Sequence, residues 1–441
     1  MPPSWSQLGL HVIAKPTGPI CNLRCAYCFY LEKESLYGRG ETWRMPDETL
    51  EAYVRQYFEA QPAAIEEIDF AFQGGEPTLL GIDFFRRVLD LQKKHAPASV
   101  RVHNSLQTNG VLLDDRWCEF LREHDFLVGL SIDGPINLHD EYRRDKQGRG
   151  TFQHVTDAMR RLFRHGVEFN ALTCVNRHNA EHPGRVYRFL RDSGIEFMQF
   201  IPIVERLAAA PSAADAPSAM PEDLVSERSV RPRQYGRFLI EVFDEWIRHD
   251  VGRVFVRDFD QALGAWTGVG ASLCVYTKHC GRATAIEHNG DLYSCDHFVD
   301  PAHKLGNIHE TPIRELANSP RQEQFGLDKE AGLPEVCRRC RYLFFCNGAC
   351  PKDRFVHAAD GQPGLNYLCE GYKMFCEHVD PHMKAMAEEL AAGRPAANVM
   401  HRLRAEGQRA REEAAAAGPV RRNAPCPCGS GRKFKSCCMR R

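Results

Sequence analysis

Short apolar runs alternate with longer amphipathic stretches along the first half of the chain. Five runs rich in apolar residues are predicted to be strands: 65–72, 99–108, 125–132, 167–176 and 195–204. Apolar residues recur at helical spacing in the segments that follow three of these runs: 83–95, 151–166 and 182–194. This alternation predicts a parallel sheet or an open α/β barrel, in which chemistry gathers at the C-terminal ends of the strands.

The loops at those strand ends carry the most informative residues of the first half. They read CNLRCAYC at 21–28, QGGEP at 73–77, QTNG at 107–110 and SIDGP at 131–135. Because parallel strands end at one edge of a sheet, we expect these four loops to meet there.

The pattern changes after residue 204. Residues 205–230 are rich in Ala, Pro and Ser, which is typical of a mobile loop, and 233–250 is predicted to be a helix. Cysteines are dense from 274 to 376, residues 380–420 alternate Ala, Glu and Arg as a helical linker would, and the end of the chain is a separate cysteine module. The expected units are 1–205, 206–273, 274–380, 381–420 and 421–441.

Composition limits the class of protein. The 441 residues are 43% hydrophobic, which is enough for a sizeable core without disulfides. No signal peptide or apolar run long enough to span a bilayer is present, so we expect a cytoplasmic protein. The net charge of −1 offers no global field for nucleic acid or anionic lipid, and no nucleic-acid partner is expected. In a reducing compartment, the 18 cysteines are better explained as metal ligands than as disulfides.

Three cysteines with the spacing CxxxCxxC follow the first strand: Cys21, Cys25 and Cys28. A closed zinc or iron-sulfur site uses four ligands, so three either leave one iron of a cluster open or form a zinc knuckle with a distant fourth ligand. In the next loop, Gly74 and Gly75 permit close backbone approach, and Glu76 can accept from an ammonium group. GGEP alone is also an ordinary turn.

Together, these motifs resemble the signature of radical S-adenosylmethionine enzymes, which form an open α/β barrel of the partial TIM type. The resemblance implies a [4Fe-4S] cluster on the three cysteines, whose open iron binds the amino and carboxylate groups of S-adenosylmethionine. It places Tyr27 against the adenine and the segment Gly74, Gly75 and Glu76 at the amino group of the cofactor. Ser131 and Asp133 would line the ribose region.

A second cysteine set supplies eight thiolates, enough for two complete four-cysteine sites. A zinc ribbon is the alternative for a CxxC pair alone. The spacing resembles the SPASM domain of radical S-adenosylmethionine enzymes that act on peptides and proteins. That resemblance implies an auxiliary [4Fe-4S] cluster nearer the active site, held by Cys274, Cys280, Cys295 and Cys350. It implies a distal [4Fe-4S] cluster held by Cys337, Cys340, Cys346 and Cys369, with Cys376 as a replacement for Cys369.

Within that superfamily, the chain resembles the anaerobic sulfatase-maturating enzymes over roughly residues 10 to 380. The segments CNLRCAYCFY, FAFQGGEPTL, QTNG, SIDGP, QFIP, GDLYSCDHFV and LGNI carry this resemblance. It implies oxidation of a serine or cysteine in a sulfatase to Cα-formylglycine, started by a 5′-deoxyadenosyl radical. Asp296 would be the catalytic base, although on its own it reads as a surface aspartate. Tyr30 and Gln73 would face the peptide, and a flavodoxin or ferredoxin would supply electrons.

The last 16 residues contain Cys426, Cys428, Cys437 and Cys438, which can complete a tetrahedral zinc site. The segment resembles the SEC-C motif. It is locally basic, and this charge indicates either a solvated linker or a docking site for a partner protein.

Two other functions fit the same motifs. One is a radical enzyme that modifies a ribosomally made peptide; we expect no leader-binding domain, since the predicted barrel begins by about residue 10. The other is a non-catalytic iron-sulfur electron-transfer protein, against which the open three-cysteine site argues. Cleavage of S-adenosylmethionine to 5′-deoxyadenosine separates an enzyme from such a protein.

Overall fold

A single ten-stranded sheet organises the part of the chain that the structure describes. The computed structural model describes residues 5–38, 40–207, 221–416, 422–425 and 433–436. The strands are β1 (His11–Lys15), β2 (Glu67–Phe72), β3 (Arg101–Thr108), β4 (Phe126–Ser131), β5 (Phe169–Val175), β6 (Phe197–Pro202), β7 (Phe255–Val256), β8 (Ala283–Glu287), β9 (Asp291–Tyr293) and β10 (Lys304–Asn307).

The strand order is β10-β9-β8-β1-β2-β3-β4-β5-β6-β7. The pairs from β8 through β1 to β7 are all parallel, whereas β8 with β9 and β9 with β10 are antiparallel. β10 and β7 lie at the two ends of this order, so the curved sheet is open. The expected open α/β barrel is therefore confirmed.

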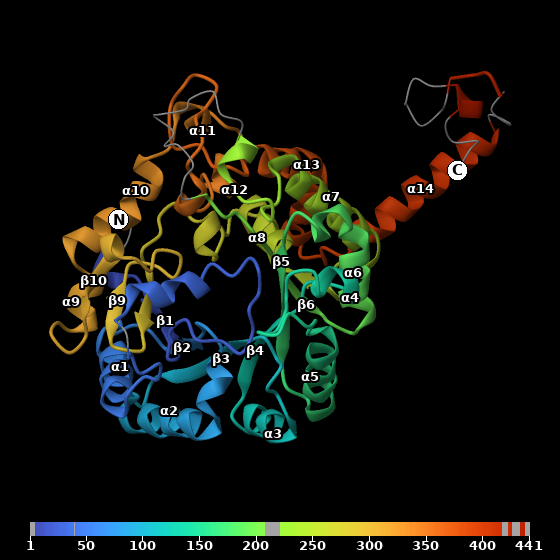
Figure 1. Cartoon of the computed structure of the whole chain (residues 1–441). Coiled ribbons are helices and arrows are strands. Elements are labelled where there is room, and N and C mark those ends of the chain that lie inside the picture. Colours follow the sequence, from blue (N-terminus) through green and yellow to red (C-terminus); the bar gives the residue numbers. More distant parts are fainter. Residues whose placement is uncertain (1–4, 39, 208–220, 417–421, 426–432, 437–441) are drawn as a thin grey trace.

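Helices between the parallel strands cover the outer face of the barrel (Figure 1). These are α1 (Asp47–Glu59), α2 (Ile82–His95), α3 (Asp115–Glu123), α4 (Ile136–His139), α5 (Phe152–His165) and α6 (Pro183–Asp192). α2 shows why they do so: its apolar residues Phe84, Phe85, Val88 and Leu91 recur on one face and are buried, while its charged residues face water.

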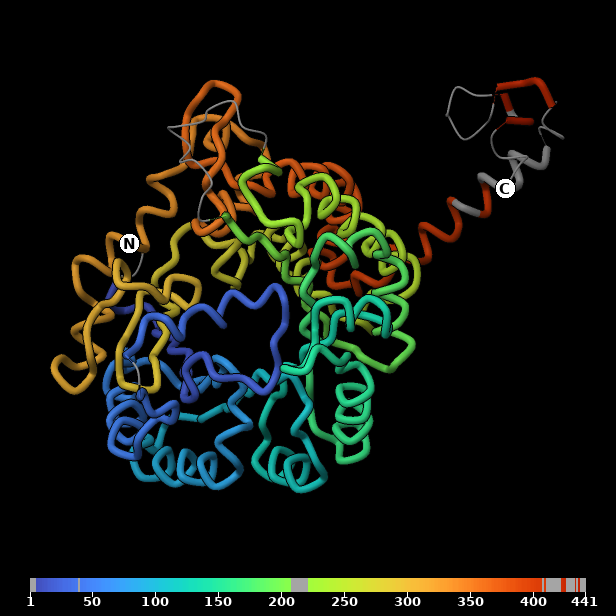
Figure 2. The backbone as a smooth tube through the Cα atoms, viewed as in Figure 1, coloured from blue at the N-terminus to red at the C-terminus, as the bar shows by residue number. Residues whose placement is uncertain are grey.

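The later helices all follow β6 in the chain. They are α7 (Pro232–His249), α8 (Arg257–Trp266), α9 (Ile313–Ala317), α10 (Pro320–Ala331), α11 (Glu335–Arg338), α12 (Leu343–Cys346), α13 (Cys369–Ala391) and α14 (Asn398–Ala416). α13 lies along α7, and α14 leads away from the body of the protein (Figure 2). No helix among the described ranges is both long and apolar enough to cross a membrane.

The cysteine-rich segment connects to the elements on both of its sides. β8, which lies beyond residue 274, pairs along its whole length with β1, so the cysteine-rich segment extends the barrel sheet. α13 begins in the cysteine-rich segment and continues past residue 380 to Ala391. The central part of the loop expected at 205–230 lies outside the described residues, and its two described ends are joined by the bridge between Arg206 and Val225.

Candidate functional site

The loops singled out in the sequence follow β1, β2, β3 and β4, so they lie at one edge of the parallel sheet. The loop after β1 carries the three cysteines and runs across the open end of the barrel before α1 begins (Figure 2). This edge is where an α/β barrel presents its reactive groups.

Two glycines let the GGEP loop pack directly against the cysteine loop. The amide of Gly75 donates to the carbonyl of Gly18 at 2.7 Å, and the amide of Glu76 donates to that of Ile20 at 2.9 Å. A Cβ at position 75 would overlap the carbonyl oxygen of Ile20, and Gly74 has a φ of +123°. The glycines therefore place one loop against the chain just before Cys21.

The carboxylate of Glu76 is buried and engaged by its own chain. One oxygen accepts from the hydroxyl of Thr108 at 2.7 Å and from the amide of Thr78 at 3.1 Å. The other accepts from the amide of Asn109 at 2.8 Å. These bonds hold the ends of β2 and β3 together, so in this structure the side chain positions loops, and its contact with a cofactor ammonium stays a prediction.

The three cysteines of the N-terminal loop lie close together. The pKa of Cys21 is raised to about 11 and that of Cys25 to about 12, mainly by burial, and the charge of Cys28 is a lesser cause in both cases. The sulfur of Cys21 accepts from the amide of Leu23 at 3.4 Å and from the side chain of Asn109 at 3.5 Å. Asn109, in the QTNG loop, was not singled out from the sequence. Thiolates in this environment need the positive charge of a bound metal centre.

Tyr27 and Asp133 also meet, although 106 residues separate them. The Tyr27 hydroxyl donates to the Asp133 carboxylate. The guanidinium of Arg143 forms a buried ion pair with the same carboxylate at 3.0 Å and lies over the Tyr27 ring. Sequence reasoning missed Arg143, because a lone arginine after a short helix carries no local signal. Ser131 is the last residue of β4, two positions before Asp133 in the sequence, and it is buried.

Cys174 at the end of β5 belongs to the same cluster. Its sulfur accepts from Arg143 at 3.7 Å and its amide donates to Asp133 at 2.9 Å. Cys118, by contrast, is fully buried in α3.

Asp296 pairs with a lysine from the opposite end of the chain. Its carboxylate forms an ion pair with the ammonium of Lys15, the last residue of β1, and only 15% of its side chain is exposed. Burial raises the pKa of Asp296, but the charges of Lys15 and His297 outweigh it and bring that pKa below its ordinary value. The carboxylate is thus held ionised at the inner edge of the barrel.

Lys15 joins the predicted base to both predicted substrate contacts. Its ammonium donates to the amide oxygen of Gln73 at 2.9 Å and lies 4.1 Å from the centre of the Tyr30 ring. Gln73 in turn donates to Gln107 at 2.6 Å. Only 1% of the Lys15 side chain is exposed. A buried lysine ending a strand is the signal that would have identified this residue, but burial is not readable from one sequence.

The eight remaining described cysteines of the predicted sites fall into two groups in space. In the first group, the pKa of Cys280 is raised to about 11. Burial is the main cause, and the charge of Cys274 also raises it. The pKa of Cys295 is raised by burial, and the charges of Asp296, Cys350 and Cys274 add to it. The charges of Cys350 and Cys274 thus both act on Cys295, although Cys346 is the cysteine nearest to Cys350 in sequence.

The second group lines a cavity of about 650 Å³. Burial raises the pKa of Cys369 to about 12, and the next causes are the charges of Cys337, Cys346 and Cys340. Cys376 is fully buried on the same helix, two turns after Cys369, and also lines the cavity. Five thiols therefore line a cavity in which four are expected to be cluster ligands.

The thiol chemistry fits iron-sulfur clusters. The fourteen described cysteines are all free of disulfides. Within the described ranges, no three His, Cys, Asp or Glu side chains converge on a point that could hold a single metal ion. A zinc ion draws its ligands that close together, whereas a four-iron cluster spaces them around a larger centre. The four cysteines of the C-terminal module lie outside the described residues.

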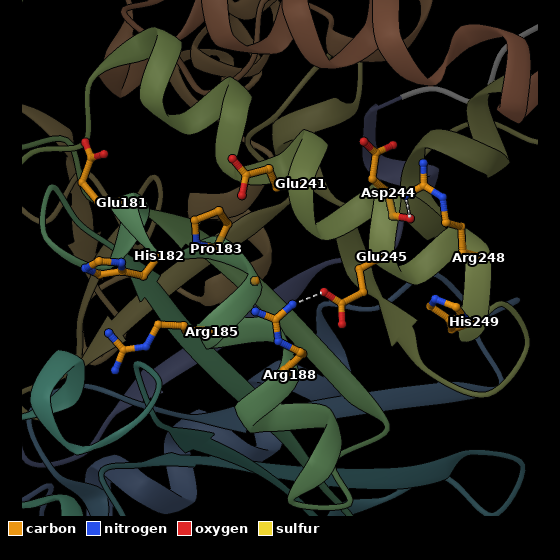
Figure 3. Close-up of a pocket in the computed structure, with 11 residues that line it drawn as sticks. Glu181, His182, Pro183, Arg185, Arg188, Glu241, Asp244, Glu245, Arg248 and His249 are labelled. Atoms are coloured by element: carbon orange, nitrogen blue, oxygen red, sulfur yellow. Dashed lines mark hydrogen bonds and ion pairs between the residues drawn. The ribbon is translucent and has the colours of Figure 1, made fainter. Parts of the chain in front are cut away.

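A separate polar pocket of about 510 Å³ lies on the outer surface between α6 and α7 (Figure 3). Among its charged side chains, Arg188 pairs with Glu245 at 2.7 Å, and Asp244 pairs at 2.7 Å with His378 of α13, which does not line the pocket. None of the predicted site residues lines it.

Family profiles match three parts of the chain. The Radical SAM superfamily matches residues 16–190, an iron-sulfur cluster-binding domain named SPASM matches 274–341, and the SEC-C motif matches 422–440.

Curated relatives match nearly the whole chain. A serine-type anaerobic sulfatase-maturating enzyme of Bacteroides thetaiotaomicron is 44% identical over 90% of this chain and 95% of its own length. A cysteine-type anaerobic sulfatase-maturating enzyme of Clostridium perfringens is 34% identical over 86% of this chain and 99% of its own. A solved structure described as native anSMEcpe with bound AdoMet superposes with a TM-score of 0.76 at 34% identity, covering 86% of this chain and 99% of that one. A second, with AdoMet and the Cp18Cys peptide, has the same TM-score at 33% identity and the same coverage.

Proposed function

Because this chain belongs to the anaerobic sulfatase-maturating enzymes of the radical S-adenosylmethionine superfamily, we propose that it oxidises a serine or cysteine side chain of a sulfatase to Cα-formylglycine. The observation that carries this proposal is the contact of Asp296 with Lys15, which also binds Gln73 and touches Tyr30. One network thus joins the residues to which the family resemblance gives the roles of base and substrate contact.

The cofactors are iron-sulfur clusters and S-adenosylmethionine, and their number and ligands are part of the proposal. We assign one cluster to Cys21, Cys25 and Cys28. A second, which we call the first auxiliary centre, is assigned to Cys274, Cys280, Cys295 and Cys350, and a third, the distal centre, to Cys337, Cys340, Cys346 and Cys369. When bound, these groups supply a 5′-deoxyadenosyl radical and a route for electrons. A small electron carrier, such as a flavodoxin or ferredoxin, supplies reducing equivalents, and the C-terminal module binds zinc.

The protein residues order the cofactor site. Arg143 and Tyr27 hold the Asp133 carboxylate toward the barrel interior, and Glu76 ties the GGEP loop to the end of β3. In the proposal, Tyr27 lies against adenine, Ser131 and Asp133 line the ribose region, and the backbone of Gly74, Gly75 and Glu76 receives the methionine ammonium. These groups are fixed before the cofactor arrives, which lowers the ordering entropy that binding must overcome.

Asp296 receives the proton in the oxidation. Loss of one hydrogen atom from the substrate Cβ leaves a carbon radical; loss of one electron and of the hydroxyl or thiol proton then gives the aldehyde or thioaldehyde. A carboxylate with a lowered pKa is ionised at neutral pH and free to accept that proton. Its neighbour Cys295 belongs to the first auxiliary centre, so the acceptors of the proton and of the electron lie side by side.

The experiment is anaerobic incubation of the reconstituted protein with S-adenosylmethionine, reductant and two synthetic peptides that carry Ser or Cys in the motif Ser/Cys-x-Pro-x-Arg. Mass spectrometry should detect loss of two hydrogen atoms from the serine peptide, or exchange of sulfur for oxygen with loss of two hydrogen atoms from the cysteine peptide. Cofactor cleavage with neither product would contradict the proposal.

A further inference from the structure

A lysine with no role in the proposed reaction lies beside the first auxiliary centre. Lys329, in α10, is completely buried. Its ammonium donates to the carbonyls of Cys274 at 2.6 Å and Val275 at 3.1 Å, and to that of Thr277. All three acceptors belong to the loop that begins at Cys274.

This ammonium has no carboxylate counter-ion in the described part of the chain. The salt bridges there pair other lysines with Asp or Glu, whereas Lys329 meets only neutral carbonyl groups. A buried cation is strongly unfavourable unless an anion compensates it. The acceptor Cys274 and the next cysteine of the same loop, Cys280, are both predicted ligands of the first auxiliary centre. The negative charge that compensates this cation is therefore best supplied by that centre.

Two nearby lysines differ from Lys329 both in their exposure and in their partners. Lys352 is half-buried, with 26% of its side chain exposed, and it pairs with Asp353 at 2.6 Å. Lys278 lies in the same loop as Cys274, but it is 61% exposed and pairs with Glu330 at 2.9 Å. Of these three cations, only Lys329 is fully buried and has no carboxylate partner.

We propose that Lys329 is the fixed counter-charge of the first auxiliary centre and favours its one-electron reduced state. Reduction adds one negative charge to the centre, and an unscreened cation in the protein interior stabilises that charge. The added electron is the one that leaves the substrate radical while Asp296 takes the proton. The centre therefore gains the one electron that the substrate loses. The inference rests on the proposed function and makes Lys329 a positioning residue for the electron acceptor.

The test compares reduction potentials in the full-length reconstituted enzyme. Lys329→Gln keeps a hydrogen-bond donor and removes the charge, Lys329→Arg keeps the charge, and Lys278→Gln is the exposed control. Redox titration followed by electron paramagnetic resonance gives the midpoint of each centre, with the first auxiliary signal assigned as the one lost in Cys295→Ser. We expect Lys329→Gln to lower that midpoint by at least about 59 mV, a tenfold change in the one-electron equilibrium. Lys329→Arg and Lys278→Gln should match the wild type.

Each outcome decides between a charge effect and a structural one. An unchanged midpoint in Lys329→Gln with full iron content overturns the inference. If Lys329→Gln loses the centre but Lys329→Arg keeps it at the normal midpoint, the charge is required and the inference holds; loss in both variants shows a structural role and overturns it. A wild type without any auxiliary signal would instead contradict the proposed function.

Discussion

The ammonium of Lys15 and the carboxylate of Asp296 form a buried ion pair between the end of β1 and the residue that follows Cys295. The contact depends on the parallel pairing of β8 with β1, which brings the cysteine-rich segment to the barrel edge. It ties the predicted base to the predicted substrate contacts.

Replacing Lys15 with Met should destabilise the protein and slow aldehyde formation. The substitution leaves the Asp296 carboxylate buried without its partner, which typically costs about 3–5 kcal/mol. Thermal unfolding should show a clear drop in melting temperature. The double variant Lys15→Met/Asp296→Asn should recover part of that drop, because no unpaired charge remains. Equal melting temperatures for the single and double variants would show that the pair contributes little.

Gly75→Ala should disrupt the N-terminal cysteine site. The new methyl group overlaps the backbone of Ile20 and pushes the loop that carries Cys21 out of place. Iron content should fall and cleavage of S-adenosylmethionine should drop at least tenfold, measured as 5′-deoxyadenosine. Gly38→Ala is the matched control, since a Cβ there meets open space. Full activity of Gly75→Ala would refute the close packing of the two loops.

Asp258 gives the fold a predictable pH dependence. It is buried in α8, and burial raises its pKa from 3.8 to about 6, although the Tyr276 hydroxyl donates to it at 2.6 Å. Between these values the native state holds a proton that the unfolded state has released, so stability falls as pH rises through this window. A shift of roughly 2 pKa units corresponds to about 3 kcal/mol.

Asp258→Asn should remove this dependence. The melting temperature of the variant, relative to that of the wild type, should be higher at pH 7.5 than at pH 5. Asp83→Asn, at an exposed position, should show no such change with pH. A constant difference between variant and wild type at the two pH values would contradict the raised pKa.

Deletion of residues 421–441 should leave oxidation of short peptides within about twofold of the wild type. The deletion removes none of the residues that make the predicted cofactor and substrate contacts. Zinc content should fall by one equivalent, while action on a folded or nascent sulfatase should weaken. Loss of peptide turnover on deletion would count against a docking role for the module.

The strands, the barrel class and the clustered loops could be predicted because their signals are local. Apolar runs identify β2 to β6, and the cysteine and glycine spacings mark the loops. The roles of Lys15, Arg143 and Lys329 could not be predicted in this way. Each acts through a partner far along the chain, and burial of a cation becomes visible only after folding. The addition of β8 to β1 is likewise a non-local pairing that no window of sequence contains.

The carboxylates of Glu76 and Asp133 show a second limit of prediction from sequence. Sequence and resemblance mark both as cofactor contacts, yet in the structure both are bonded to their own chain. A motif identifies a residue as part of a site without separating direct contact from support. Only the hydrogen bonds around each group make that distinction.

The most direct test of the account is the ratio of aldehyde to 5′-deoxyadenosine formed by Asp296→Asn under anaerobic conditions. The substitution keeps the shape of the side chain and removes the base, so hydrogen abstraction should continue while proton loss fails. Asp300→Asn, four residues away at the start of a short helix, is the control and should keep the normal ratio. We predict near-normal 5′-deoxyadenosine from Asp296→Asn with at least a hundredfold less formylglycine. Formylglycine at close to the wild-type rate would contradict the central claim that Asp296 takes the substrate proton.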